Sequence, residues 1–178
     1  MIYSIVLLIL LLASSNSSCA SADDEPDTSP DGRYSIYNFG RSTWDWGSYY
    51  EIRSKDGTVL LSTKSDTNSP SHANEAMWSS DNQFVLFWYN HGQPKATGIY
   101  SFTEHKLLSL YPDLDGYTVP VRWIGPHTFV VENLTGMLGH DNGPVVHYRQ
   151  TFRVHIHPFS IECIYTGPTI IDPKADDP

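Results

Sequence analysis

Cysteine and positive charge are both scarce in this chain. Two cysteines occur among 178 residues, and 11 lysines and arginines stand against 20 aspartates and glutamates, so the formal net charge is −9. A buried core rather than a set of disulfides must therefore stabilise the fold. An acidic chain without a lysine- or arginine-rich patch is poorly suited to phosphate backbones or anionic lipid, and we expect no nucleic-acid partner.

Recognisable catalytic motifs are also missing. The sequence has no Gly-x-Ser-x-Gly, His-Glu-x-x-His or paired-carboxylate pattern. Residues 136–143 are rich in glycine, but they lack the strand-to-helix context of a phosphate-binding loop. These absences favour a binding or scaffold module over an enzyme.

The one long aliphatic run lies at the N-terminus. Residues 5–13 are almost entirely aliphatic, and this run is shorter than the roughly 20 residues that a helix needs to cross a bilayer. Small residues follow as Ala20-Ser21-Ala22, directly before an acidic stretch. This is the layout of a cleaved secretory signal. We therefore predict a signal peptide over residues 1–22 and a secreted or periplasmic protein.

Cys19 leaves an alternative open for the same segment. A bacterial lipoprotein is acylated on a cysteine in this place, which would anchor the protein to a membrane, although the aliphatic residue expected three positions earlier is replaced by Asn16. Once Cys19 is removed or acylated, Cys163 has no intrachain disulfide partner. Cys163 lies in an apolar-rich strand pattern at residues 159–165, and we expect it to be a small buried core residue.

Two polar segments bound the expected folded unit. Residues 23–31 contain five acidic residues and two prolines without any other apolar side chain, which is typical of a solvated linker. Residues 173–178 have the composition of a disordered tail. The folded domain is therefore expected over residues 32–172.

Within that domain, a period of two predicts an all-β fold of about 9–11 strands in antiparallel meanders. The pairs Asp56-Gly57 and Gly125-Pro126 mark hairpins, and a long alternating strand is expected over residues 144–157. Residues 83–89 are apolar on both faces, which predicts a central strand covered on both sides, with Trp88 buried. The one helix candidate covers residues 70–77.

An internal repeat links two of the strand entries. Residues 29–34 read Ser-Pro-Asp-Gly-Arg-Tyr, and residues 78–84 read Trp-Ser-Ser-Asp-Asn-Gln-Phe. Both resemble the Trp-Ser-Pro-Asp-Gly-x-aromatic entry of TolB-like β-propeller blades, and residues 78–110 match one four-stranded blade best. The first copy lacks the tryptophan, and the second has Ser80 and Asn82 in place of proline and glycine. A third copy at residues 121–130 lacks the Asp-Gly pair.

The resemblance implies that the Asp-Gly pair makes a tight turn and that the tryptophan packs between blades. Three blades cannot close a ring, since propellers have at least four. The resemblance therefore implies an open stack of blade-like meanders, half of a dimeric ring, or a β-sandwich that reuses the same hairpins. It implies no catalytic residues, because propeller function lies in variable loops.

The first candidate site is aromatic. In an extended chain, Trp44, Trp46 and Tyr50 share one face. A flat aromatic strip of this kind stacks on sugar rings or on partner side chains, although aromatic residues of this size also fill β cores. The composition favours core or inter-sheet packing, and the candidate that stands beside it is a ligand-binding strip for a protein or carbohydrate partner.

The second candidate site is rich in histidine and defines a rival function. His155 and His157 are two positions apart on the long strand, so their side chains would project from one face and could hold zinc with a third ligand from His140 or Asp141. A metal-assisted hydrolase would follow from such a site. Two arginines share this face and would repel a dication, and a solvated polar face explains the pattern without any cofactor.

The favoured function is an exported, non-catalytic binding or scaffold module. Its partner would be a protein, a carbohydrate or a second copy of the chain. A membrane contact is expected only if Cys19 is lipidated.

Overall fold

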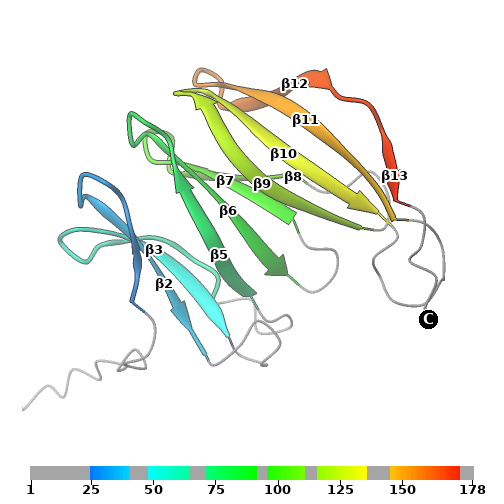
Figure 1. Ribbon diagram of the computed structural model, residues 1–178. Helices are drawn as coiled ribbons and strands as arrows, with labels where there is room; N and C mark the ends of the chain where they lie inside the picture. The colour runs from blue at the N-terminus through cyan, green and yellow to red at the C-terminus, as the bar shows by residue number, and fades with distance from the viewer. Residues whose placement is uncertain are drawn as a thin grey trace, which may run out of the picture.

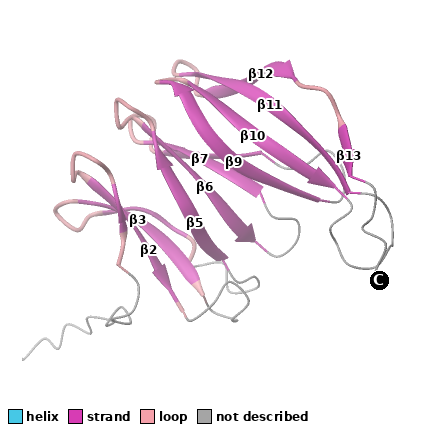
Figure 2. Ribbon diagram, in the orientation of Figure 1, coloured by secondary structure: helices cyan, strands magenta, loops and turns pink. Residues whose placement is uncertain are grey.

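The computed structural model describes residues 25–40, 48–64, 71–91, 96–110, 116–135 and 145–172. Every helix or strand in this part of the chain is a β-strand, and the thirteen strands form three antiparallel sheets (Figures 1 and 2). This confirms the predicted all-β fold. No described segment forms a helix that is long and apolar enough to span a membrane.

Each sheet is a meander whose neighbouring strands follow one another in the chain, except that β13 pairs with β11. Sheet A consists of β1 (Asp27–Thr28), β2 (Tyr34–Phe39), β3 (Tyr49–Ser54) and β4 (Val59–Ser62). Sheet B consists of β5 (Ser71–Trp78), β6 (Phe84–His91), β7 (Ala96–Ser101) and β8 (Lys106–Leu110). Sheet C consists of β9 (Gly116–Gly125), β10 (Thr128–Thr135), β11 (Val145–His155) and β12 (Ser160–Thr166), with β13 (Ile170–Asp172) paired to β11. The short strands β1 and β13 raise the count above the expected 9–11.

Sheet B lies in the middle of the stack, between sheets A and C (Figure 1). Val85 and Phe87 of β6 are buried in a core shared with sheet A, whereas Phe84 and Leu86 are buried in a core shared with sheet C. A strand with apolar neighbours on both faces needs apolar side chains at successive positions. The prediction of a central strand is confirmed, although Trp88 is half-buried rather than fully buried.

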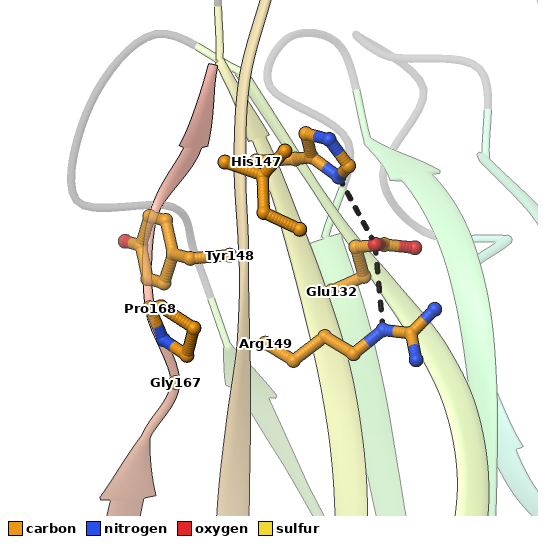
Figure 3. A pocket seen from close by; sticks show the side chains of 7 residues that line it. Glu132, His147, Tyr148, Arg149, Gly167 and Pro168 are labelled. Atoms are coloured by element: carbon orange, nitrogen blue, oxygen red, sulfur yellow. Dashed lines mark hydrogen bonds and ion pairs between the residues drawn. The ribbon is translucent and has the colours of Figure 1, made fainter. Parts of the chain in front are cut away.

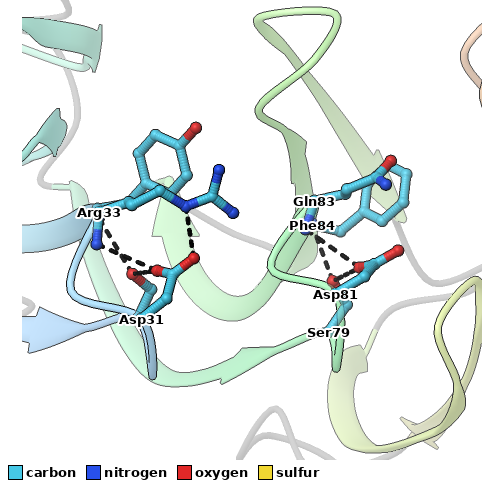
Figure 4. A network of polar contacts seen from close by, with 8 residues as sticks. Asp31, Arg33, Ser79, Asp81, Gln83 and Phe84 are labelled. Carbon is cyan, nitrogen blue, oxygen red and sulfur yellow. Dashed lines mark hydrogen bonds and ion pairs between the residues drawn. The ribbon is translucent and has the colours of Figure 1, made fainter.

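The two copies of the sequence repeat form the same turn (Figure 4). In the first copy, the Ser29 hydroxyl donates to the Asp31 carboxylate at 2.8 Å and accepts from the backbone amide five residues further on at 3.0 Å. In the second, Ser79 and Asp81 make the same two contacts at 2.7 and 3.0 Å. Each aspartate also accepts from the amide two residues later, at 3.1 Å. A short polar motif therefore starts β2 and β6 in the same way.

The residue after each aspartate adopts a left-handed backbone conformation. Its φ is 69° at Gly32 and 55° at Asn82. Glycine enters this region without steric cost, and asparagine is among the residues that tolerate it best. The departure from Asp-Gly at Asn82 is therefore accommodated. Because the two turns match, each residue of β2 corresponds to the residue of β6 that follows it by 50 positions.

The helix expected over residues 70–77 is wrong, because this segment forms β5. β5 pairs antiparallel with β6, and its register shifts between Asn74 and Met77. Glu75, which lies in this shift, has a φ of 53°. A single eight-residue segment has little helical stability of its own, so pairing with a central strand overrides its local preference.

Part of the expected linker belongs to the fold. Asp27 and Thr28 lie within residues 23–31, but they pair with Ile36 and Ser35 of β2. Ser29 is only 3% exposed, because its hydroxyl and its backbone are both engaged in the first turn. The acidic composition of residues 23–31 predicted a solvated linker. The pairing of β1 with β2 and the turn at Ser29 and Asp31 instead hold part of this segment against sheet A.

Both predicted hairpins are confirmed, since β3 pairs with β4 around Asp56-Gly57 and β9 pairs with β10 around Gly125-Pro126. The long alternating strand is β11. Its residues Phe152 and Val154 are buried in the core shared with sheet B. The faces of sheets A and C that point away from sheet B are not covered by sheet B.

Candidate binding surfaces

Sheet A has one face against sheet B and one face away from it. Ile36 and Tyr50 are buried in the core between these sheets. Side chains alternate along a strand, so the residues next to them in the chain lie on the opposite face. We define the outer face of sheet A by the side chains of Tyr37, Phe39, Tyr49, Glu51 and Arg53.

Three aromatic rings form a row on this outer face. The ring of Phe39 stacks on that of Tyr49 with centroids 4.5 Å apart, and the Tyr37 ring stacks on Phe39 at 6.5 Å. The Arg53 guanidinium carbon lies 5.0 Å from the Tyr37 centroid and 5.4 Å from the Phe39 centroid. The Lys64 ammonium lies 5.4 Å from the Tyr49 centroid. The row is therefore capped by two cations at cation–π distance.

A buried carboxylate holds the arginine in place. The Glu51 side chain is 9% exposed, accepts from Arg53 Nε at 2.8 Å, and accepts from the Ser62 hydroxyl at 3.1 Å. A charge with so little solvent contact is tolerated only when it is paired and hydrogen-bonded. Glu51 therefore fixes the guanidinium of Arg53 over the rings.

The outer face of sheet A corresponds to a buried face of sheet B. With the offset of 50 residues, Tyr37 corresponds to Phe87 and Phe39 to Tyr89. Phe87 and Tyr89 are buried in the core between sheets A and B. In sheet B, these aromatic residues pack against the neighbouring sheet A. Sheet A has aromatic residues at the corresponding positions, but there they lie on its outer face.

A pocket of ≈ 320 Å³ lies on sheet C (Figure 3). At its polar end, Glu132 Oε1 lies 3.3 Å from His147 Nδ1 and 3.4 Å from Arg149 Nε. These residues come from the adjacent strands β10 and β11, whose register places Glu132 opposite Arg149. The remaining wall, built from β11 and the segment around β13, is lined by Tyr148, Gly167, Pro168 and Ile170.

Tyr50 does not lie on an exposed strip. Its side chain is fully buried, with its ring centroid 5.4 Å from that of Phe87 in an edge-on contact. Tyr50 is thus a core residue, which is the packing that the composition favoured. Four other predicted residues and the lipidation candidate lie outside the described residues: Trp44, Trp46, His140, Asp141 and Cys19.

The structure does not bring His155 and His157 together as metal ligands. β11 ends at His155, so His157 lies in the following turn rather than on the same strand face. His155 Nε2 lies 3.0 Å from Glu162, and His157 Nδ1 lies 3.0 Å from Glu104. Within the described residues, no three histidine, cysteine or carboxylate side chains gather into a metal-binding group.

Cys163 is exposed, so its predicted burial is wrong. It lies on β12, which pairs only with β11 among the described strands and therefore forms an edge of sheet C. The thiol lies 3.6 Å from the Thr166 hydroxyl. An apolar strand pattern indicated a core position, but at this edge the apolar side chains of Ile164 and Tyr165 are themselves 40% and 60% exposed.

Sequence reasoning missed both surfaces, for different reasons. The outer aromatic row carried a usable signal, because the matched turns relate Tyr37 of β2 to Phe87 of β6. The group formed by Glu132, His147 and Arg149 had no corresponding signal in the sequence. Its assembly depends on the register between β10 and β11, and the sequence of the long segment that joins them, residues 136–144, does not specify that register.

No protein-family model and no curated protein matches this chain.

Proposed function

We propose that this chain is an exported, non-catalytic binding module that holds a protein partner on the outer face of sheet A. The observation that carries the proposal is the row of Tyr37, Phe39 and Tyr49 capped by Arg53 and Lys64. Tyrosine, other aromatic residues and arginine are the groups that supply most of the binding energy in protein interfaces.

The packing of the rings favours a protein over a carbohydrate. A sugar stacks on an open ring face, but here the ring faces contact one another, with an angle of only 10° between Phe39 and Tyr49. Arg53 and Lys64 lie over the remaining faces. Phe39 is only 9% exposed, so the edges of Tyr37 and Tyr49 and the two cations are left for contact. This combination suits a protein surface that carries apolar side chains and carboxylates.

The outer face of sheet A is also held rigid before binding. Glu51 fixes Arg53 through its Nε, and Ser62 holds the same carboxylate from the neighbouring strand. Side chains that are already ordered lose little conformational entropy when a partner covers them. This rigidity supports a role in recognition rather than in packing alone.

We further propose that the three sheets are blade-like units related to TolB-type propellers. The matching turns at Ser29 and Ser79 support this relation. So do two tryptophans between sheets: Trp78 packs in the core of sheets A and B, and Trp123 Nε1 donates to the Met77 carbonyl across sheets B and C at 2.8 Å. Blade-like stacks present loops and end faces to their partners.

Affinity capture with matched variants tests the binding function. The chain would be used to capture partners from the exported fraction of the producing organism, and mass spectrometry would identify the retained proteins. We expect Tyr37→Ala and Tyr49→Ala to lose the partner, whereas Tyr165→Ala, an exposed tyrosine on sheet C, retains it. An identical set of proteins on all three variants would contradict the proposal, as would binding to a glycan array that depends on Tyr37.

Export has its own test. From the apolar run at residues 5–13 and the small residues before Asp23, we expect the mature chain to begin at Asp23 or at a lipidated Cys19. The intact mass of the protein from the exported fraction distinguishes these two forms. A mature protein that still carries Met1 would contradict the export signal.

A further inference from the structure

We propose that the pocket on sheet C binds a small ligand in which a carboxylate is joined to an aliphatic group. The pocket lies between β10, β11 and the segment around β13, whereas the partner proposed above binds sheet A. The two proposals therefore stand on different residues and fail independently.

The polar end of the pocket offers an arginine that is only partly used. Arg149 contacts Glu132 through Nε, and its side chain is nevertheless 63% exposed. Arginine carries five N–H donors in a planar fork, so a contact through Nε leaves the Nη groups available to a second carboxylate. Glu132 is 25% exposed and restrains the guanidinium, which lowers the ordering cost when a ligand binds.

The other end of the pocket is apolar. Tyr148, Pro168 and Ile170 line it, and Figure 3 shows Tyr148 and Pro168 on the side of the pocket away from Arg149. Ile170 is 52% exposed and Ile171 is 61% exposed, so apolar surface at this rim remains in water. An aliphatic group that covers such surface is stabilised because it removes apolar area from water.

Size and charge restrict the ligand further. The volume of ≈ 320 Å³ is near the lower end of small-molecule sites, which span roughly 300–1,000 Å³, so a ligand of few atoms fits best. The exposed guanidinium of Arg149 offers N–H donors, which suit a carboxylate acceptor, whereas the Glu132 carboxylate is already engaged by His147 and Arg149 and offers less to a cation.

Titration of the full chain with hexanoate, followed by amide chemical shifts in NMR spectra, tests the proposal. Acetate lacks the aliphatic tail, and hexanamide keeps the tail but lacks the charge. We expect saturable hexanoate binding at roughly millimolar Kd, with shifts centred on residues 146–149 and 167–171. Both comparison compounds should bind at least about tenfold more weakly. Equal binding of acetate would overturn the proposal, because it would reveal only a surface anion contact.

A matched pair of arginines on β11 provides the control. Arg149 and Arg153 lie on the same face of this strand, but only Arg149 lines the pocket. We expect Arg149→Met to weaken hexanoate binding at least about tenfold, and Arg153→Met to change it less than about twofold. If Arg149→Met does not fold, Arg149→Lys serves instead, because it keeps the charge and removes the fork. Equal losses at the two arginines, or shifts elsewhere, would overturn the site.

Discussion

The Asp81 carboxylate links the turn before β6 in sheet B to the turn between β9 and β10 in sheet C. It accepts hydrogen bonds from the Ser79 hydroxyl and the Gln83 amide, and its Oδ2 lies 3.2 Å from His127 Nε2 in the turn between β9 and β10. Burial opposes ionisation of this group. The hydrogen bonds outweigh burial, so the pKa of Asp81 lies below its usual range.

The lowered pKa of Asp81 predicts how stability depends on pH. A carboxyl with a depressed folded-state pKa stabilises the protein above its unfolded pKa of about 3.9, and this contribution is lost as the pH falls through the folded value. We expect Asp81→Asn to cost about 1 kcal/mol of unfolding free energy at pH 7. Below pH of about 4 the difference from wild type should shrink. Urea unfolding from pH 7 downwards measures both.

Asp31→Asn is the matched control for this measurement. Asp31 holds the same place in the first turn, but it contacts Arg33 rather than a histidine of the next sheet. The loss at pH 7 should therefore be smaller for Asp31→Asn. Equal losses for the two variants would show that the contact between Asp81 and His127 does not stabilise the stack.

Tyr49 and Tyr50 are neighbours in sequence with opposite surroundings. Tyr50 is fully buried between sheets A and B, and Tyr49 lies on the outer face of sheet A. We expect Tyr50→Ala to lower the free energy of unfolding by about 3–5 kcal/mol, as for a large core residue. Tyr49→Ala should cost about 1 kcal/mol, mostly from the lost ring contact with Phe39. Equal losses in urea unfolding would refute the assignment of the two faces.

At the scale of one strand, β7 depends on a residue without a side chain. A Cβ at Gly98 would lie 2.9 Å from an atom of the Phe87 ring and 3.2 Å from the Tyr89 ring. Gly98 faces Phe87 directly in the pairing of β6 with β7. Because Gly98 has no side chain, β7 leaves room for the rings of Phe87 and Tyr89 in the core between sheets A and B.

Gly98→Ala should therefore destabilise the protein by about 1–3 kcal/mol through overpacking. The double variant Gly98→Ala with Phe87→Leu should recover part of that loss, because leucine is smaller than the ring that the new methyl group meets. Thermal or urea unfolding of the two single variants and of the double variant measures this. A double variant that loses the sum of the two single effects would contradict the proposed clash.

Strands that are marked by a pattern of neighbouring residues could be predicted from the sequence. Strands whose conformation depends on pairing with a distant segment could not. The Asp56-Gly57 hairpin and the apolar β6 each depend on a few neighbouring residues, and both are confirmed. β5 differs, because its strand conformation depends on pairing with β6 rather than on its own residues. Cys163 differs for a similar reason, since its exposure depends on the place of β12 at the edge of sheet C.

At the scale of the whole molecule, the outer face of sheet A and the pocket on sheet C differ in the same way: a sequence pattern marks the first and not the second. The outer face of sheet A could have been found from the repeat, because Tyr37 follows Ser29 as Phe87 follows Ser79. The pocket on sheet C needs the tertiary register of β10 and β11, which no local pattern of residues specifies.

The three sheets are coupled through the middle one. Asn38 of sheet A donates to the Ala73 carbonyl at 2.7 Å and accepts from the Ala73 amide at 2.9 Å, which ties sheet A to sheet B. Trp123 of sheet C donates to the Met77 carbonyl and so ties sheet C to the same strand. Because β5 takes part in both links, loss of sheet B would expose both cores to water.

We therefore expect the described sheets to unfold as one unit. Phe87→Ala weakens the core of sheets A and B, and Phe84→Ala weakens the core of sheets B and C. Each variant should lower the opening free energy measured by amide hydrogen exchange in both β3 and β11, by about 3–5 kcal/mol. If Phe87→Ala lowered protection in β3 and left β11 unchanged, sheet C would have to fold independently of sheet A. The two cores would then be separate units, because a cooperative stack must transmit a loss in either core through β6.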